Sequence, residues 1–204
     1  MSLEYVVSCV ICTLFGLLFS YFAYMNLRGE QLGKEGRRFI FEMDVVMGGL
    51  LGLPRFSKIE GTVLGLGAVG AFLSWSTAPT HQLITVVGLM LLVIYLVVCS
   101  IYAVFARQPY APYLGISGLL VGLGAWRATR MMPAESLQTV AGFVAFATVL
   151  CGLAGLQMRR RAPSQQAHID KLVAILAFIE AHEDWDWPEG ADAPIGFDAA
   201  QTSS

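Results

Sequence analysis

The chain has 204 residues, of which 56% are hydrophobic and 14% charged, and its mean hydropathy is +0.63. A soluble domain carries about 25% charged residues, so this composition excludes an ordinary soluble protein and predicts an integral membrane protein. Eight of the fifteen acidic residues but only one of the thirteen lysines and arginines lie from Asp170 onward. The remaining basic residues flank apolar segments, where membrane topology explains them, so we expect no nucleic-acid partner.

The first apolar segment covers residues 5–25. It is long enough to cross a hydrocarbon core of about 30 Å, for which about 20 residues are needed. Glu4 is the only charged residue before it and no small-x-small cleavage site follows it, so the pattern predicts an uncleaved spanning helix. The Cys9-x-x-Cys12 spacing also occurs in metal and dithiol sites, but no Cys-rich partner motif exists. We therefore expect packed free thiols at Cys9, Cys12, Cys99 and Cys151.

The next segment, residues 38–54, has too short an apolar stretch to span and carries Glu42 and Asp44. As a helix it would place several apolar side chains on one side: Phe39, Ile40, Met43, Val46, Met47 and Leu50. This pattern predicts an interfacial or re-entrant helix that Pro54 ends.

Four further apolar runs are long enough to span, at residues 59–78, 83–106, 111–129 and 136–158. With five spans, eleven lysines and arginines fall on one side of the membrane and two on the other. Basic residues favour the inner side, so the N-terminus is predicted outside and the C-terminus inside. A sixth span at 39–53 would break this alternation.

Small residues recur at helical spacing within the predicted spans. Lipid gives helices no hydrophobic reason to associate, so close backbone approach at small residues is the main means of packing. The two clearest faces are Gly61-x-x-x-Gly65, continued by Gly67 and Gly70, and Gly118-x-x-x-Gly122. We expect Gly61, Gly65, Gly118 and Gly122 to pack helices, and Gly152 and Gly155 to form a similar face in the fifth span.

The Gly115-Ile116-Ser117-Gly118 sequence resembles the signature of the rhomboid intramembrane proteases over four residues. That family pairs its serine with a histidine on a later membrane helix. The later histidines here, His168 and His182, follow the last predicted span, and a serine without a base in reach is a poor nucleophile. Helix packing is therefore the preferred role for Ser117, and we expect no catalytic site.

Ionisable residues inside the bilayer usually mark transport or proton pathways. Glu60 and Arg127 lie near the ends of their spans, where a side chain is expected to reach the interface by snorkelling. None of the three histidines, including His81 in a short loop, lies within a span, so the pattern gives no haem or chlorophyll ligand. We expect neither an ion pathway nor a bound cofactor or metal.

After Pro163 the sequence becomes polar and amphipathic. Ser164 is placed to cap a helix that ends at Pro188, with one apolar face made of Ile169, Leu172, Val173, Leu176 and Ile179. The remainder is polar and structureless by composition. Trp185 and Trp187 alternate with Glu183, Asp184 and Asp186, and no calcium-loop spacing is present, so these five residues are predicted to dock on a basic partner surface.

Residues 58–135 resemble the DoxX-like small membrane proteins, a group that includes assembly chaperones. The resemblance lies in the Gly-rich run KIEGTVLGLGAVGAFLS, then a Leu/Val span, a polar link containing proline and a closing span with arginine. Leu64 stands where that family typically has a glutamate, so the resemblance implies a fold and no site.

Together these patterns predict an all-α, polytopic membrane protein with five spanning helices, an interfacial helix and a C-terminal amphipathic helix. Residues 1–161 would form the transmembrane bundle and residues 162–204 the amphipathic helix and acidic tail. We expect a non-catalytic accessory subunit whose partners are lipid and other membrane-protein subunits; a DoxX-like assembly chaperone is the alternative. The uncleaved first span, the basic inner side and the absence of glycosylation sequons favour a respiratory-type complex of the mitochondrial inner membrane.

Overall fold

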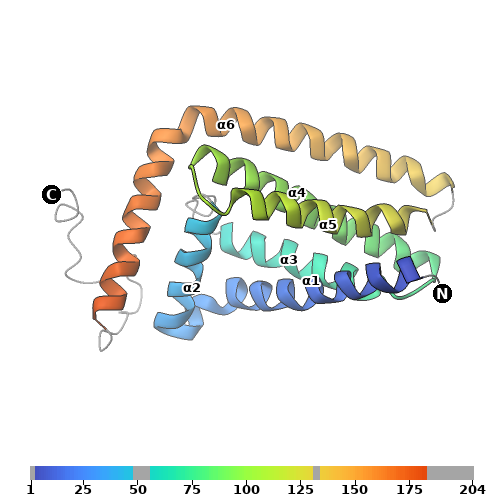
Figure 1. The fold of residues 1–204 in the computed structure, drawn as a ribbon, viewed down its shortest axis with the longest axis horizontal. Coiled ribbons are helices and arrows are strands. Elements are labelled where there is room, and N and C mark those ends of the chain that lie inside the picture. Colours follow the sequence, from blue (N-terminus) through green and yellow to red (C-terminus); the bar gives the residue numbers. More distant parts are fainter. Residues whose placement is uncertain (1–2, 48–55, 131–133, 183–204) are drawn as a thin grey trace.

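The computed structural model describes residues 3–47, 56–130 and 134–182. Over these residues the chain is all-α, with six α-helices and one short 3-10 helix (Figure 1). The elements are α1 Leu3–Arg28, η1 Gly29–Leu32, α2 Gly33–Val46, α3 Phe56–Leu73, α4 Pro79–Phe105, α5 Ala111–Thr129 and α6 Ala134–Ala181.

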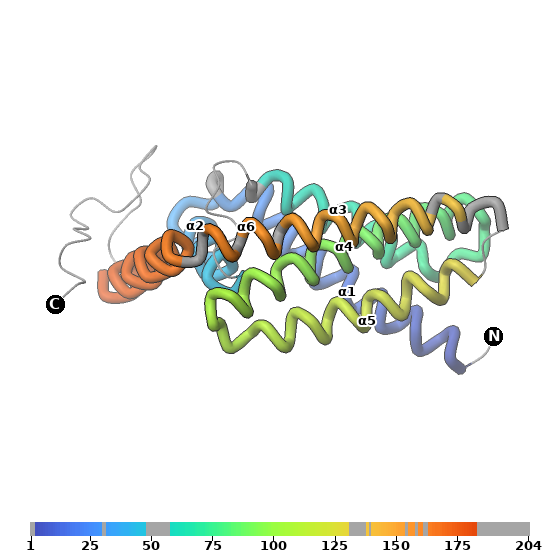
Figure 2. The backbone as a smooth tube through the Cα atoms, turned by 90° about the horizontal axis from the view of Figure 1, so that it is seen from above, coloured from blue at the N-terminus to red at the C-terminus, as the bar shows by residue number. Residues whose placement is uncertain are grey.

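Four helices and the first part of α6 run side by side, whereas α2 and the last part of α6 cross one end of this bundle (Figure 1). α1 packs on α3, α3 packs on α4, and α4 packs on both α5 and α6. α4 is therefore the central helix, and α6 passes over the bundle as the outermost element (Figure 2).

Three helices are long and apolar enough to cross a membrane: α1, α4 and the part of α6 from Val140 to Gln157. They indicate a multi-pass membrane protein and coincide with three of the five predicted spans. α3 and α5 are helices of 18 and 19 residues at the predicted places, and their spanning stays a prediction. The second span was predicted to reach residue 78, but α3 ends at Leu73 and Pro79 already begins α4, so His81 lies in the first turn of α4.

The bundle has two chemically different ends. α1 begins at the same end as the α3–α4 turn and the last residues of α5, and we call this the N-terminal end (Figure 1). α2, the α4–α5 turn and the bend of α6 lie at the other end, called the basic end. The described basic residues there are Arg28, Lys34, Arg37, Arg38, Lys58, Arg107, Arg159, Arg160 and Lys171. Of the described basic residues, only Arg127 and Arg130 belong to the N-terminal end, as the predicted alternation requires.

The helix at the basic end begins earlier than predicted. α2 starts at Gly33 and its last residue is Val46, while residues 48–55, with Leu50 and Pro54, lie outside the described part. Met43 and Met47 are buried as the apolar face requires. Asp44 is buried as well, which the pattern did not predict, because the last part of α6 covers that side of α2.

α6 differs from the prediction at Pro163. The helix continues from Ala134 to Ala181 with Pro163 inside it, so Ser164 does not begin a new helix and residue 162 does not begin a separate element. The helix bends strongly near this proline instead (Figure 1), because proline lacks the amide hydrogen and its ring clashes with the preceding turn. On the last part of α6, Ile169, Leu172, Ile175 and Ile179 are buried, whereas Val173 of the predicted face is exposed.

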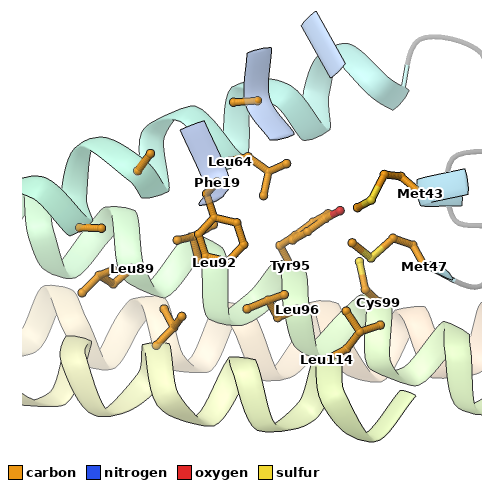
Figure 3. Close-up of a cluster of buried hydrophobic side chains, with 14 of the residues drawn as sticks. Phe19, Met43, Met47, Leu64, Leu89, Leu92, Tyr95, Leu96, Cys99 and Leu114 are labelled. Carbon is orange, nitrogen blue, oxygen red and sulfur yellow. The ribbon is translucent and has the colours of Figure 1, made fainter. Parts of the chain in front are cut away.

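The core lies along α4. Large buried side chains from α1, α3 and α5, among them Phe19, Leu64 and Leu114, converge on Leu92 and its buried neighbours in α4 (Figure 3). At the basic end the core is closed by α2, whose Met43 and Met47 point toward Tyr95 and Cys99 of α4. Burial of these apolar groups against one another fixes how α2 lies on the bundle.

Candidate functional site

The predicted docking residues lie outside the described part of the chain, which ends at His182. The residues concerned are Glu183, Asp184, Trp185, Asp186 and Trp187. Their docking role stays a prediction.

The predicted packing glycines all lie at helix contacts, but these contacts differ in closeness. A Cβ added at Gly61 would lie 2.8 Å from Cγ of Leu27 in α1, which is too close for two carbon atoms. At Gly65, Gly118 and Gly122 the nearest atom would be 3.9, 3.5 and 3.8 Å away, which is ordinary van der Waals contact. Gly61 is therefore the one of the four at which an added side chain would require a neighbour, the side chain of Leu27, to move.

The close backbone approach of α3 and α4 involves Gly88, a residue that the sequence did not single out. A Cβ on Gly88 would lie 2.7 Å from the carbonyl oxygen of Leu66 and 3.1 Å from Cα of Gly70. α3 and α4 therefore cross with their backbones in contact at Gly70 and Gly88. Gly88 is the single glycine of α4, so a pattern of repeated small residues does not reveal it. Close approach of two helices needs only one small residue from each helix.

The membrane-type part of α6 has a face that no described residue covers. None of the residues from Val140 to Gln157 whose burial the structure describes is buried, and a Cβ on Gly142, Gly152 or Gly155 would meet nothing within 4 Å among the described residues. Large side chains on this part of α6 are about half exposed or more: Val144, Phe146, Val149, Leu153 and Leu156. The predicted packing at Gly152 and Gly155 is thus not made with any of the described residues.

Glu60 does not snorkel to the interface, so that expectation was wrong. The side chain is 1% exposed, and its Oε1 accepts a hydrogen bond from the hydroxyl of Tyr95 in α4. Oε2 has no hydrogen-bond partner among the described residues. The physical reason is helix phase, because Glu60 shares a face with buried Leu64 and Ala71, and this face turns toward the core. Leu64, which stands where DoxX-like proteins have a glutamate, is buried four residues from this carboxyl.

Arg127 is also buried, at 9% exposure, and the snorkelling expected of it was wrong too. Nη1 donates to Sγ of Cys9 over 3.1 Å and Nη2 donates to the carbonyl oxygen of Ser74 over 3.1 Å. The guanidinium also lies over the ring of Tyr5, 4.6 Å from its centroid. Arg127 follows Gly124 by three residues and therefore lies on the helix face that packs on α1, which is the signal that was overlooked.

Further polar contacts surround Arg127 at the N-terminal end. The thiol of Cys9 donates to the same Ser74 carbonyl over 3.3 Å, and the hydroxyl of Tyr5 donates to the carbonyl of Trp75 over 2.8 Å. Both carbonyls follow the last residue of α3, where backbone oxygens lack partners inside the helix. The side chains of α1 and α5 thus satisfy the end of α3. Cys9, Cys12 and Cys99 are buried free thiols, as predicted.

A groove of about 440 Å³ opens between α1 and α5 beside this cluster. The two helices meet where Sγ of Cys12 would lie 2.7 Å from a Cβ on Gly124, and toward the N-terminal end they separate (Figure 2). The lining residues are Leu3, Glu4, Val7, Ser8, Ile11, Cys12, Leu120, Leu123, Gly124, Trp126 and Arg127. The groove is therefore apolar along its walls, with a guanidinium at one end.

At the basic end, His168 of α6 lies with its Nε2 2.8 Å from Oδ2 of Asp44 in α2. The ring of His168, one of the two histidines that follow the last predicted span, thus contacts a carboxylate of α2. On the exposed face of α2, Arg38 donates to Glu42 over 2.8 Å, and this hydrogen bond raises the pKa of the guanidinium. Among the described residues no group of three or more His, Cys, Asp or Glu side chains is arranged to hold a metal ion.

No protein-family model, curated protein or solved structure matches the chain. The resemblance to the DoxX-like proteins therefore stays a prediction from the residues quoted above.

Proposed function

We propose that this chain is a non-catalytic accessory subunit of a larger membrane-protein complex. The observation that carries the proposal is the uncovered face of α6 between Val140 and Gln157. Lipid can cover an apolar helix whether or not the helix contains glycine, and each glycine weakens a helix by about 1 kcal/mol relative to alanine. Contact with lipid alone therefore does not explain glycines on this face. Gly142, Gly152 and Gly155 on an uncovered span are explained by a helix of another subunit that approaches the backbone closely.

The finer parts of the proposal come from the sequence. The complex would be of the respiratory type, in the mitochondrial inner membrane, with the basic end of the bundle on the inner side. The acidic segment with Trp185 and Trp187 would provide a second contact to a basic surface of a partner. Other membrane-protein subunits and lipid are the proposed partners.

The proposal is tested with Gly152→Leu. A Cβ at this position meets nothing within 4 Å among the described residues, so the substitution should leave the fold of the chain intact. It should nevertheless block close approach of a partner helix, and partner subunits should be lost when the tagged chain is purified in mild detergent and run on a native gel. Thr62→Leu, which adds a leucine at an exposed site of α3, is the matched control.

Two outcomes would contradict the proposal. Retention of all partners by Gly152→Leu would mean that this face is not an interface. Partners that are absent from the wild-type chain after purification but trapped by cross-linking in cells would favour the transient, DoxX-like assembly chaperone instead.

A further inference from the structure

Arg127 is a buried cation whose positive charge is only partly balanced. Its two terminal nitrogens donate to neutral groups, the Cys9 thiol and the Ser74 carbonyl. The carbonyl stands at the C-terminal end of α3, where the helix dipole supplies about half a negative charge. No carboxylate among the described residues forms an ion pair with Arg127, and its Nε has no hydrogen-bond partner there. Burying an unpaired charge is costly, so this site favours an anion.

The groove beside Arg127 sets the shape of that anion. Its walls are apolar, with Val7 and Ile11 from α1 and Leu120 and Leu123 from α5. Leu120 precedes Arg127 by seven residues, which is about 10 Å along a helix. The volume of about 440 Å³ lies within the range of small-molecule sites, roughly 300–1,000 Å³. A ligand that fills the groove therefore needs an anionic head and an apolar chain.

The position along the bundle indicates where such a ligand comes from. Tyr5, Trp75 and Trp126 gather at the N-terminal end, and tyrosine and tryptophan are enriched at the membrane interface. A head bound at Arg127 would therefore lie at the depth of lipid headgroups. Its chain would run along the groove toward the bilayer centre, and the groove opens sideways to lipid because Leu120 and Leu123 are exposed.

We infer that the groove between α1 and α5 binds an anionic membrane phospholipid, whose phosphate contacts the guanidinium of Arg127 and whose acyl chain lies along the apolar walls. This binding site goes beyond the proposed role as an accessory subunit, because it needs no partner protein. A lipid headgroup and a free phosphate ion could both bind Arg127 through the same phosphate group. The apolar walls of the groove favour the lipid. Glu4 also lines the groove, and its carboxylate would repel a second negative charge, which favours a headgroup with a single phosphate.

The test uses the full chain, delipidated in detergent, and native mass spectrometry during titration with phosphatidylglycerol or phosphatidylcholine. We expect phosphatidylglycerol to bind with an apparent Kd about tenfold lower, the difference that about 1.4 kcal/mol gives. Arg127→Gln should abolish this preference. Arg130→Gln is the matched control, because Arg130 lies three residues further along, is exposed, and stacks 3.9 Å from the ring of Trp126. It should retain the preference.

Two further measurements decide the inference even if Arg127→Gln fails to fold. Ser8→Phe keeps Arg127 but fills the groove, so it should weaken phosphatidylglycerol binding about tenfold or more. Excess inorganic phosphate should not displace the bound lipid. Equal binding of the two lipids, an equal loss in Arg130→Gln, unchanged binding in Ser8→Phe, or displacement by inorganic phosphate would each overturn the inference.

Discussion

Nε2 of His168 lies 2.8 Å from Oδ2 of Asp44, a contact between residues 124 positions apart in the chain. It joins the part of α6 beyond the bend to the helix that closes the basic end of the core. The side chain of Asp44 is 5% exposed, so this hydrogen bond serves a carboxylate that water hardly reaches. The contact therefore acts together with the buried apolar side chains of this segment to fix where the last part of α6 lies.

His168→Ala should loosen that part of α6 without unfolding the bundle. Loss of a hydrogen bond to a buried charged group costs about 1.5–3 kcal/mol, which would raise local amide hydrogen exchange about tenfold or more over residues 165–181. Hydrogen–deuterium exchange with mass spectrometry measures the change. His182→Ala is the control, because His182 is exposed and the contacts that its ring makes, a hydrogen bond to the carbonyl of Phe178 and stacking on the Phe178 ring, lie within its own helix end. Equal exchange in the two variants would show that the Asp44 contact does not hold α6.

The crossing of α3 and α4 should tolerate no side chain at Gly88. A Cβ there would lie 2.7 Å from a backbone oxygen, which cannot move aside as a side chain can. Gly88→Ala should therefore lower stability by about 1–3 kcal/mol. Gly118→Ala should be neutral or stabilising by up to about 1 kcal/mol, since the nearest atom is 3.5 Å away and alanine favours the helix. Thermal unfolding in detergent compares the two, and similar losses would refute the assigned crossing.

The long apolar helices were predictable because the length of an apolar run alone selects them. α4 and α5 lie within a few residues of the predicted 83–106 and 111–129. What each residue faces was harder to predict, because it depends on which neighbour covers each side of a helix. Glu60 and Arg127 illustrate this, since a position near a helix end is compatible with the interface and equally with a packed core face.

The long-range contacts could not be read from local patterns. The Asp44–His168 contact requires that α6 bends back over α2, and a proline after an apolar run predicts a helix end as readily as a bend. The groove at Arg127 requires that α1 and α5, far apart in the sequence, meet at Gly124 and then diverge. The docking residues around Trp185 and Trp187 lie outside the described part and remain predictions.

The hydroxyl of Tyr95 should contribute to the stability of the fold, because it is the hydrogen-bond partner of the buried Glu60. Its hydroxyl donates to Oε1, and Oε2 has no partner among the described residues. Tyr95→Phe would leave both oxygens unsatisfied, at about 1–3 kcal/mol. Replacing both partners by apolar groups is often nearly neutral, so Tyr95→Phe combined with Glu60→Met should recover much of the loss. Tyr113→Phe, at a 70% exposed site, is the control for hydroxyl removal. Unchanged thermal unfolding of Tyr95→Phe would contradict this role.

The two ends of the bundle should lie on opposite sides of the membrane. The start of α1 and the α3–α4 turn share one end, while the α4–α5 turn and the bend of α6 share the other (Figure 1). Most described basic residues lie at the second end, so it should face inward. Protease-sensitive tags placed at the N-terminus and after Ser76 should be cleaved from outside, and tags after Gln108 and at the C-terminus should be protected. Protection of the tags at both termini, or cleavage of both, would require an even number of spans, and either α3 or α5 would then have to lie within one leaflet.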